Sequence, residues 1–242
     1  MHTIKTLLVL AHPGHELRVF HWMECVSPEV FILTDGSGGS QVPRTSYSEE
    51  VVARAGAKAG QPFGAMSDRL WYDAILAKDP DPFRQFADAV FNAAEGADAV
   101  AVVADAVDGY NPVHDLTSAI GASVNMRLRQ AGIAVTDFLV SAAVPGVTAC
   151  EALEVRLDAD ARERKLNAVR AYAPLADEAR RVLAEAPESF SHEVLHRQDF
   201  HWPDDFVPFW EKLARDRVST GRYTRAITYR DHVLPIARAL MG

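Results

Sequence analysis

The sequence contains only two cysteines, Cys25 and Cys150, in 242 residues. Two thiols can build neither a disulfide framework nor a cysteine-rich zinc cluster. This excludes small domains that are held together by several disulfides or by cysteine-bound zinc. The sequence also lacks an apolar run long enough to span a membrane, and no charged stretch followed by an apolar signal region precedes the first apolar run at Ile4. We therefore expect a soluble, cytoplasmic protein.

Basic residues are too few and too scattered to bind a nucleic-acid backbone. The formal net charge is −8, and the Lys and Arg residues are interspersed among acidic ones. We expect a small-molecule partner and no nucleic acid. With 48% hydrophobic residues, the chain can bury one large core. We expect a single domain over residues 1–242, with residues 187–242 forming an aromatic-rich extension packed on it.

Apolar β-type runs alternate with helical segments along the first 140 residues. We expect strands over residues 4–10, 29–33, 97–104 and 135–140, and helices over 17–25, 48–60, 82–94 and 116–131. Strands separated by helices predict an α/β fold with a doubly wound, mostly parallel sheet and helices on both faces. In such a sheet, the first strand commonly lies beside the strand that begins the second half, and a crevice opens between them.

Histidines follow both strands that would flank this crevice. His12 and His15 come directly after the first strand, and His114 comes after the exit loop of the strand at 97–104. Because the carboxyl ends of parallel strands meet at one edge, the three imidazoles can share a ligand. Such a set suits zinc, and would also accept nickel, cobalt or iron. Alternatively, His12 caps a helix, and His15 and His114 are ordinary residues of first helical turns.

The residues around these histidines resemble a known family. The run His12-Pro13-Gly14-His15-Glu16 resembles the His-Pro-Asp-Asp-Glu motif of the LmbE-like, or PIG-L, deacetylases, and Gly109–His114 resembles their later His-Pro-Asp-His segment. The loop Leu33–Gly38 is similar to their Thr-Asx-Gly-acidic-x-Gly loop, and Arg164–Tyr172 is similar to the helix after their last sheet strand. The resemblance extends from residue 1 to about residue 180.

This resemblance implies a Rossmann-like fold and zinc-dependent hydrolysis of N-acetyl groups on amino sugars. It places the metal ligands at His12, His15 and His114. It also implies substrate contacts at four polar positions, namely Asp35, Arg44, Asp68 and Asn111.

Three positions depart from the family pattern. The family's general-base Asp is Gly14 here, its second motif Asp is the ligand His15, and the first His of its later segment is Asn111. An all-imidazole set still suits zinc, although it adds one unit of positive charge. Because glycine cannot take a proton, we expect Asp115 or Glu16 to be the catalytic acid–base group. Each could instead stabilise a helix dipole or orient a neighbouring histidine.

The C-terminal part has several further candidate features. His192 and His196 have the spacing of a metalloprotease helix, but their surroundings favour a structural role, and His232 is a more distant candidate proton carrier. We expect the aromatic residues of 200–210 to dock on the domain, although they could also wall a substrate or bury the face of a homo-oligomer. A β-type run follows Tyr223.

Two functions remain. One is a zinc-dependent hydrolase of an amide, with an N-acyl amino sugar or a related small metabolite as the first candidate substrate. The other is a noncatalytic descendant of the deacetylase fold that keeps the site for binding a metal or ligand.

Overall fold

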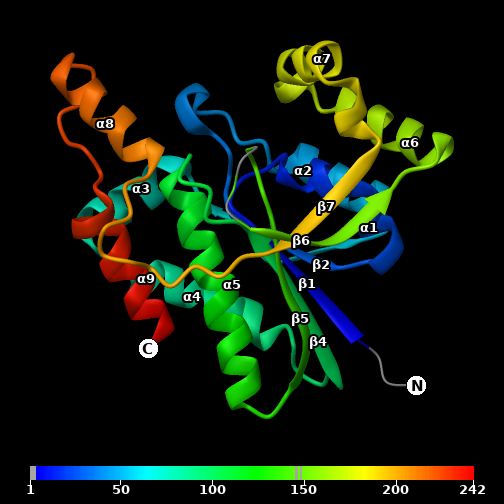
Figure 1. The fold of residues 1–242 in the computed structure, drawn as a ribbon, viewed down its shortest axis with the longest axis horizontal. Coiled ribbons are helices and arrows are strands. Elements are labelled where there is room, and N and C mark those ends of the chain that lie inside the picture. The colour runs from blue at the N-terminus through cyan, green and yellow to red at the C-terminus, as the bar shows by residue number, and fades with distance from the viewer. Residues whose placement is uncertain (1–3, 145–146, 148) are drawn as a thin grey trace.

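The computed structural model describes residues 4–144, 147 and 149–242. Its centre is a seven-stranded sheet in the order β3-β2-β1-β4-β5-β7-β6. Neighbouring strands of the larger part are parallel, and these are β1 (Ile4–Leu10), β2 (Glu29–Thr34), β3 (Lys58–Met66), β4 (Ala99–Asp105) and β5 (Ala134–Ser141). β6 (Cys150–Arg156) and β7 (His192–Arg197) form an antiparallel edge. The expected doubly wound, Rossmann-like α/β fold is confirmed (Figure 1).

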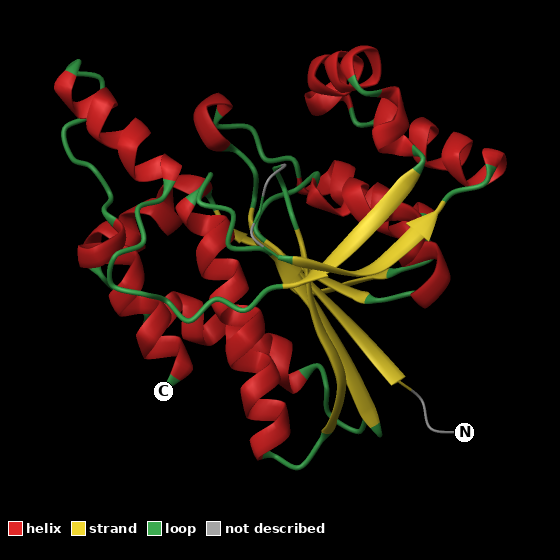
Figure 2. Ribbon diagram, viewed as in Figure 1, coloured by secondary structure: helices red, strands yellow, loops and turns green. Residues whose placement is uncertain are grey.

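β1 shows why the buried parts of the central strands are apolar on both faces, as in its residues 7–10. Leu7 and Val9 face one helical layer, and Leu8 and Leu10 face the other, because successive side chains of a strand point to opposite faces. The first layer contains α3 (Asp68–Ala77), α4 (Asp81–Asn92), α5 (Pro112–Gln130) and α9 (Leu234–Met241). The second contains α1 (Phe20–Val26), α2 (Thr45–Arg54) and α6 (Ala159–Ala171). Both layers are visible in Figure 2.

β1 and β4 lie side by side in the middle of the sheet, with Leu7 opposite Val102 and Val9 opposite Ala104. The strand order reverses here, since β2 and β3 continue on one side of the pair and β5 on the other. The loops leaving β1 and β4 therefore flank the crevice of a doubly wound sheet. This is the switch point that the sequence predicted.

α5 begins close to this crevice because its first residues are suited to a helix start. The side-chain oxygen of Asn111 accepts a hydrogen bond from the backbone N–H of Val113 (2.9 Å), and Pro112 occupies the first helical turn. The helix thus starts four residues before the expected Leu116, and His114 lies in its first turn.

The expected helix over 48–60 is wrong in both bounds. α2 ends at Arg54, Gly56 takes a left-handed φ of 67°, and β3 begins at Lys58. β3 contains two glycines and Pro62, which have low β propensity, so its sequence does not look like a strand. It is tolerated at the sheet edge, where one side of the backbone needs no strand partner.

The C-terminal segment packs on the first helical layer. Trp202, Trp210 and Tyr229 are buried in its core, and α8 (Phe209–Ser219) begins beside the loop that precedes α5. The β-type run expected after Tyr223 is not a strand. It leads into a π-helical turn, Tyr229–Val233, whose neighbours α3 and α5 are helices and offer no partner for a strand.

Two further elements complete the chain. α7 (Ala176–Glu185) follows α6 on the other side of the molecule from α8 (Figure 1). His192 and His196 lie on β7, so they are not on the helix that their spacing would suit. None of the helices in the described ranges combines the length and the apolarity needed to cross a membrane.

Candidate metal centre

Three histidine rings meet where β1 and β4 end. The ring centroids of His12 and His15 are 5.3 Å apart, those of His12 and His114 are 5.1 Å apart, and those of His15 and His114 are 4.7 Å apart. Three imidazoles bound to one tetrahedral zinc ion, with metal–nitrogen distances of about 2.0–2.1 Å, have centroids roughly 5 Å apart. The structure therefore brings together the three residues predicted as metal ligands, at separations that suit one shared ion.

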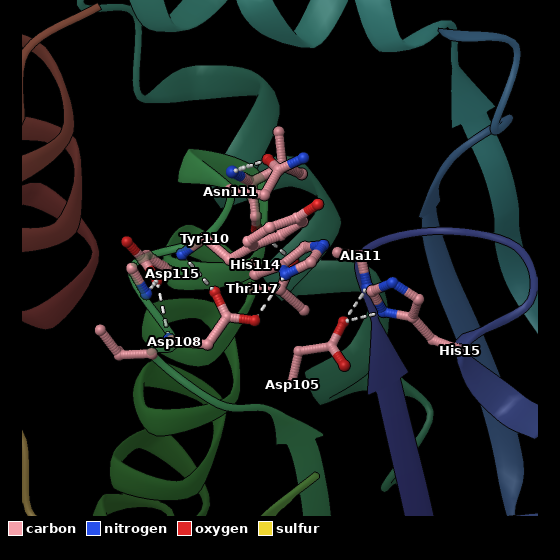
Figure 3. A network of polar contacts seen from close by, with 12 residues as sticks. Ala11, His15, Asp105, Asp108, Tyr110, Asn111, His114, Asp115 and Thr117 are labelled. Atoms are coloured by element: carbon pink, nitrogen blue, oxygen red, sulfur yellow. Dashed lines mark hydrogen bonds and ion pairs between the residues drawn. The ribbon is translucent and has the colours of Figure 1, made fainter. Parts of the chain in front are cut away.

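Each ring is held through its Nδ1 atom by a polar side chain. Nδ1 of His15 lies 2.7 Å from Asp105 Oδ2, and Nδ1 of His114 lies 2.8 Å from Asp108 Oδ2 (Figure 3). Because an ionised carboxylate only accepts hydrogen bonds, each Nδ1 carries the proton and each Nε2 keeps its lone pair. This is the outer-shell arrangement that orients metal-binding imidazoles in proteins.

His12 is held by two groups. Its Nδ1 atom lies 2.9 Å from Thr34 Oγ1 and 3.1 Å from Asp68 Oδ1. Its Nε2 atom is buried and has no hydrogen-bond partner among the described residues. An unpartnered buried polar atom is costly, and a metal ion bound there would satisfy it.

The finished coordination geometry is not present in the protein alone. Within the described residues, no group of three or more His, Cys, Asp or Glu side chains is already arranged to hold a metal ion. The ring separations, the protonation pattern and the unpartnered Nε2 atom of His12 nevertheless fit the chemistry of a zinc-type ion.

Asp105 links the two sides of the centre. Its Oδ2 atom accepts hydrogen bonds from His15 and from the backbone N–H of Ala11 (2.6 Å), and its Oδ1 atom pairs with Arg18. Burial acts to raise the pKa of Asp105, but the neighbouring charges of His15 and Arg18 outweigh it and hold the pKa below its usual range. Asp105 is therefore an ionised partner for the ring of His15.

The pKa values of Asp68, His12 and His15 are also shifted by their surroundings. Hydrogen bonding to His12 outweighs the effect of burial on Asp68 and lowers its pKa to about 2. Burial lowers the pKa values of His12 and His15, and the charge of Arg18 lowers that of His15 further. The two rings are thus neutral at neutral pH, which is the form that binds metals.

Asp115, the first predicted acid–base residue, is directed at the backbone. Its Oδ1 atom accepts from the backbone N–H groups of Asp108 and Gly109 (3.0 Å each), and its Oδ2 atom accepts from the indole of Trp210 (2.7 Å). Burial raises its pKa to about 7. Among the described residues, no hydrogen bond joins Asp115 to the three histidines, so its observed role is to hold the loop that carries Asp108 (Figure 3).

Glu16, the second predicted acid–base residue, is fully buried and also binds the backbone. Its Oε2 atom accepts from the N–H of Gly14 (2.8 Å), which closes the turn after β1. Burial raises its pKa. Within the described part of the chain, it likewise makes no hydrogen bond to the three rings.

Gly14 has a backbone that few other residues could adopt. Its φ is +104°, and a Cβ atom built on it would lie 2.5 Å from Cδ1 of Leu175. The position at which the resemblance would place a general base is thus a left-handed turn covered by a leucine side chain. A carboxylate cannot be introduced there without backbone strain.

The predicted substrate contacts hold the loops around the centre. Oδ1 of Asp35 accepts from the N–H of Ser37 (2.9 Å), and Nε of Arg44 donates to the carbonyl of Gly36 (2.8 Å). Both interactions shape the loop that follows β2. Contact of either residue with a substrate stays a prediction.

The other two predicted contacts have clear structural roles. Asp68 accepts from the N–H of Gly38 (2.9 Å) as well as contacting His12, so it ties the loop after β2 to the centre. Asn111 caps α5 and lies 3.3 Å from the hydroxyl of Tyr72. Their contact with a substrate also stays a prediction.

Four polar residues around the rings were not identified from the sequence. Thr34, Asp105 and Asp108 contact the rings directly, and Arg18 contacts Asp105. Thr34 and Asp105 are the last residues of β2 and β4, at the same edge as His12. The strand-end argument that selected His12 would have selected them too. Two other histidines have contacts of their own: His232 interacts with Thr228 at the C-terminal turn, and His196 pairs with Val140 in the sheet.

Comparison with known proteins identifies a fold relative. No protein-family model matches the sequence, and no curated protein matches it. The structure is similar to the crystal structure of the A40926 pseudoaglycone deacetylase Dbv21, with a TM-score of 0.52 and 15% sequence identity. The match covers 80% of this chain and 96% of that one. At this identity the likeness shows a shared fold.

Proposed function

We propose that this protein is a metal-dependent hydrolase that removes the acyl group from an amide, with an N-acyl amino sugar or a related small metabolite as substrate. The observation that carries the proposal is the convergence of His12, His15 and His114, with ring centroids 4.7 to 5.3 Å apart and each Nδ1 atom held by an oxygen. The fold shared with a protein named as a deacetylase supports the reaction class.

The three Nε2 atoms would hold the ion, with zinc as the first choice and nickel, cobalt or iron as alternatives. Bound zinc supplies a Lewis acid that can lower the pKa of a water molecule to about 7. The residues around the rings are suited to such an ion. Asp68, Asp105 and Asp108 bring negative charge close to an all-imidazole set, which offsets the positive charge gained where the family has a carboxylate ligand.

The same carboxylates fix the direction of the rings. Asp105 and Asp108 each accept the Nδ1 proton of one histidine, so each Nε2 lone pair remains available. Arg18 keeps Asp105 ionised and also donates to Ser141, which connects the centre to β5. These residues preorganise the centre, and they do not require a general base at position 14.

The proton for the leaving amine must come from another group. Asp115 has a pKa of about 7, which suits an acid–base group at neutral pH. Its three accepted hydrogen bonds, however, favour a positioning role for it. Asp115 and Glu16 remain the two candidates by position, and their amide variants separate positioning from proton transfer.

The test uses the purified protein, stripped of metal and reconstituted with zinc. We expect one zinc ion per chain and release of acetate from members of a panel of N-acetyl amino sugars. His15→Ala and His114→Ala should lose the metal and the activity, whereas the matched control His232→Ala should keep both. Zinc should also be released on acidification, but only at a pH well below 6.5, because imidazole must lose its proton to bind a metal and burial lowers the pKa values of His12 and His15. Absence of stoichiometric metal in the wild type, or its retention at wild-type affinity in the two ligand variants, would contradict the proposal.

The conformation of Gly14 favours a second candidate, a metal-binding protein that has lost hydrolysis. Under that hypothesis zinc binds but no substrate in the panel is cleaved. Gly14→Asp, combined with Leu175→Ala to make room for the side chain, would then be the informative variant. Gain of deacetylase activity in the double variant alone would favour a binding role for the natural protein.

A further inference from the structure

Two exposed aromatic rings lie beside the histidine centre. Tyr110 and Phe209 are 54% and 57% exposed, and their rings are parallel within 10°, with centroids 6.4 Å apart. The ring of Tyr110 also lies 6.4 Å from that of His114 (Figure 3). The two aromatic side chains therefore form a surface that is continuous with the centre.

Buried interactions fix this pair in place. Trp210, next to Phe209, donates its backbone N–H to the carbonyl of Gly109 (3.0 Å), and its indole donates to Asp115 (2.7 Å). Gly109 precedes Tyr110, so the start of α8 and the loop after β4 are joined at this point. The rings are exposed, but the backbone that carries them is anchored to the core.

Other exposed apolar side chains lie in separate loops and helices. Val42 follows β2, Leu70 lies on α3 after β3, and Val207 and Tyr223 flank α8. Exposed apolar side chains scattered singly are normal on a monomer, whereas Tyr110 and Phe209 are paired and form a patch of the kind that marks a binding surface. The contact of this pair with His114, through Tyr110, favours the substrate of that centre as the occupant.

We propose that Tyr110 and Phe209 form a subsite that stacks against an aromatic group of the amide substrate. This inference rests on the proposed function and narrows its substrate class from small N-acetyl sugars to amides that carry a flat, apolar ring. Parallel aromatic faces suit a planar group better than an alkyl chain, because aromatic rings gain a further interaction beyond the area that they bury. That gain corresponds to about a 2- to 12-fold effect on binding for each ring pair.

The test compares four substrates with the zinc-reconstituted protein: N-acetylglucosamine, N-benzoylglucosamine, phenyl N-acetylglucosaminide and N-octanoylglucosamine. We expect kcat/KM for at least one of the two aryl compounds to exceed that for N-acetylglucosamine by about tenfold, and to exceed that for the octanoyl compound. Phe209→Ala and Tyr110→Ala should each lower the value for the aryl compound by about 3- to 10-fold, with N-acetylglucosamine unaffected. Phe209→Tyr should keep the preference, and Leu153→Ala, an exposed leucine on β6, is the matched control.

The results separate this inference from the proposed function. Cleavage of N-acetylglucosamine without any aryl preference, or equal use of the octanoyl compound, would overturn the aromatic subsite and leave the hydrolase intact. If no compound is cleaved, the proposed function fails. Binding of the two aryl compounds, measured by calorimetry on the wild type and on Phe209→Ala, then tests the subsite by itself. Weaker binding of at least one of them to Phe209→Ala would then support it, and unchanged or absent binding would overturn it. A dimer that dissociates in Phe209→Ala would also overturn it, because the pair would then be an interface between copies of the chain.

Discussion

Two sets of buried carboxylates surround the histidines, and they behave in opposite ways. The inner set, Asp68, Asp105 and Asp108, faces imidazole nitrogens, whereas the outer set, Glu16 and Asp115, accepts hydrogen bonds from backbone N–H groups. Burial acts to raise the pKa of Asp68 and Asp105, yet their pKa values are lowered, and those of Glu16 and Asp115 are raised. Burial thus sets the direction of the pKa shift in the outer set, whereas hydrogen bonds and charges of the partners reverse that direction for Asp68 and Asp105.

This difference separates two tasks. Asp68 and Asp105 keep their charge, and all three inner carboxylates orient the rings, so they act on the chemistry of the centre. The outer carboxylates hold the turn at Gly14 and the loop at Asp108 in shape. Substitutions in the two sets should therefore have different consequences.

The largest effect is expected at Asp105, which contacts His15, Arg18 and the backbone N–H of Ala11. Asp105→Ala leaves Arg18 without its carboxylate and frees the N–H of Ala11. We expect the free energy of unfolding of the metal-free protein to fall by about 3–5 kcal/mol, the cost of breaking a buried ion pair, toward the low end because Arg18 is partly exposed. Urea denaturation measures it. Asp137→Ala, which removes a surface pair with Arg197, is the control and should cost far less.

The next effect concerns metal affinity and Asp68. Asp68→Asn keeps the shape of the side chain but removes the charge that faces His12. We expect zinc affinity to fall by about 10- to 100-fold, as for other outer-shell partners of metal-binding histidines. Competition with a chromogenic chelator measures it, and Asp35→Asn, in the neighbouring loop, should leave the affinity unchanged. Equal affinities for the Asp68 variant and the wild type would remove Asp68 from the inner set.

A smaller effect tests the turn that Glu16 closes. Gly14→Ala introduces a Cβ atom at a φ of +104° and against Leu175. We expect the free energy of unfolding to fall by about 1–2 kcal/mol from backbone strain. Thermal and urea unfolding measure this change. Leu175→Ala in the same chain should relieve only the side-chain contact, so full recovery in the double variant would show that φ is not the cause.

The smallest effect is expected for turnover in Asp115→Asn. If Asp115 only positions the loop, kcat should fall by less than about tenfold and zinc should remain bound. Loss of about 100- to 10,000-fold, with metal still bound, is the range for a positioned acid–base group and would place Asp115 in proton transfer instead. Glu16→Gln, measured in parallel, applies the same criterion to the other member of the outer set.

Much of the fold could be predicted because the central strands are simple. β1 from Leu7 and β4 up to Ala104 are continuous apolar runs. Each leads to histidine at the same sheet edge, so the three rings could be brought together by topology alone. β3 was missed because its glycines and Pro62 are typical of loops, and its place depends on pairing with β2. Local sequence carries no information about such a partner.

The surroundings of the rings were harder to predict. Asp105 and Thr34 had a usable signal as strand-end residues, whereas Arg18 reaches Asp105 from a different element. The capping of the loop by Asp115 depends on Trp210, and the aromatic pair joins Tyr110 to Phe209 across a long stretch of chain. Contacts of this kind are set by how the C-terminal segment docks, which residue spacing does not reveal.

The two bonds of Trp210 have a consequence for protein engineering. Trp210 secures the start of α8 to the loop that precedes His114, while the adjacent Phe209 faces solvent. Anchor and contact surface are therefore encoded by neighbouring but separate residues. A library that varies position 209 and keeps position 210 can alter ligand preference without loosening His114, whereas deletion of α8 would disturb both. If Phe209 contacts the substrate as proposed, selectivity can thus be diversified from the C-terminal segment, with the sheet left unchanged.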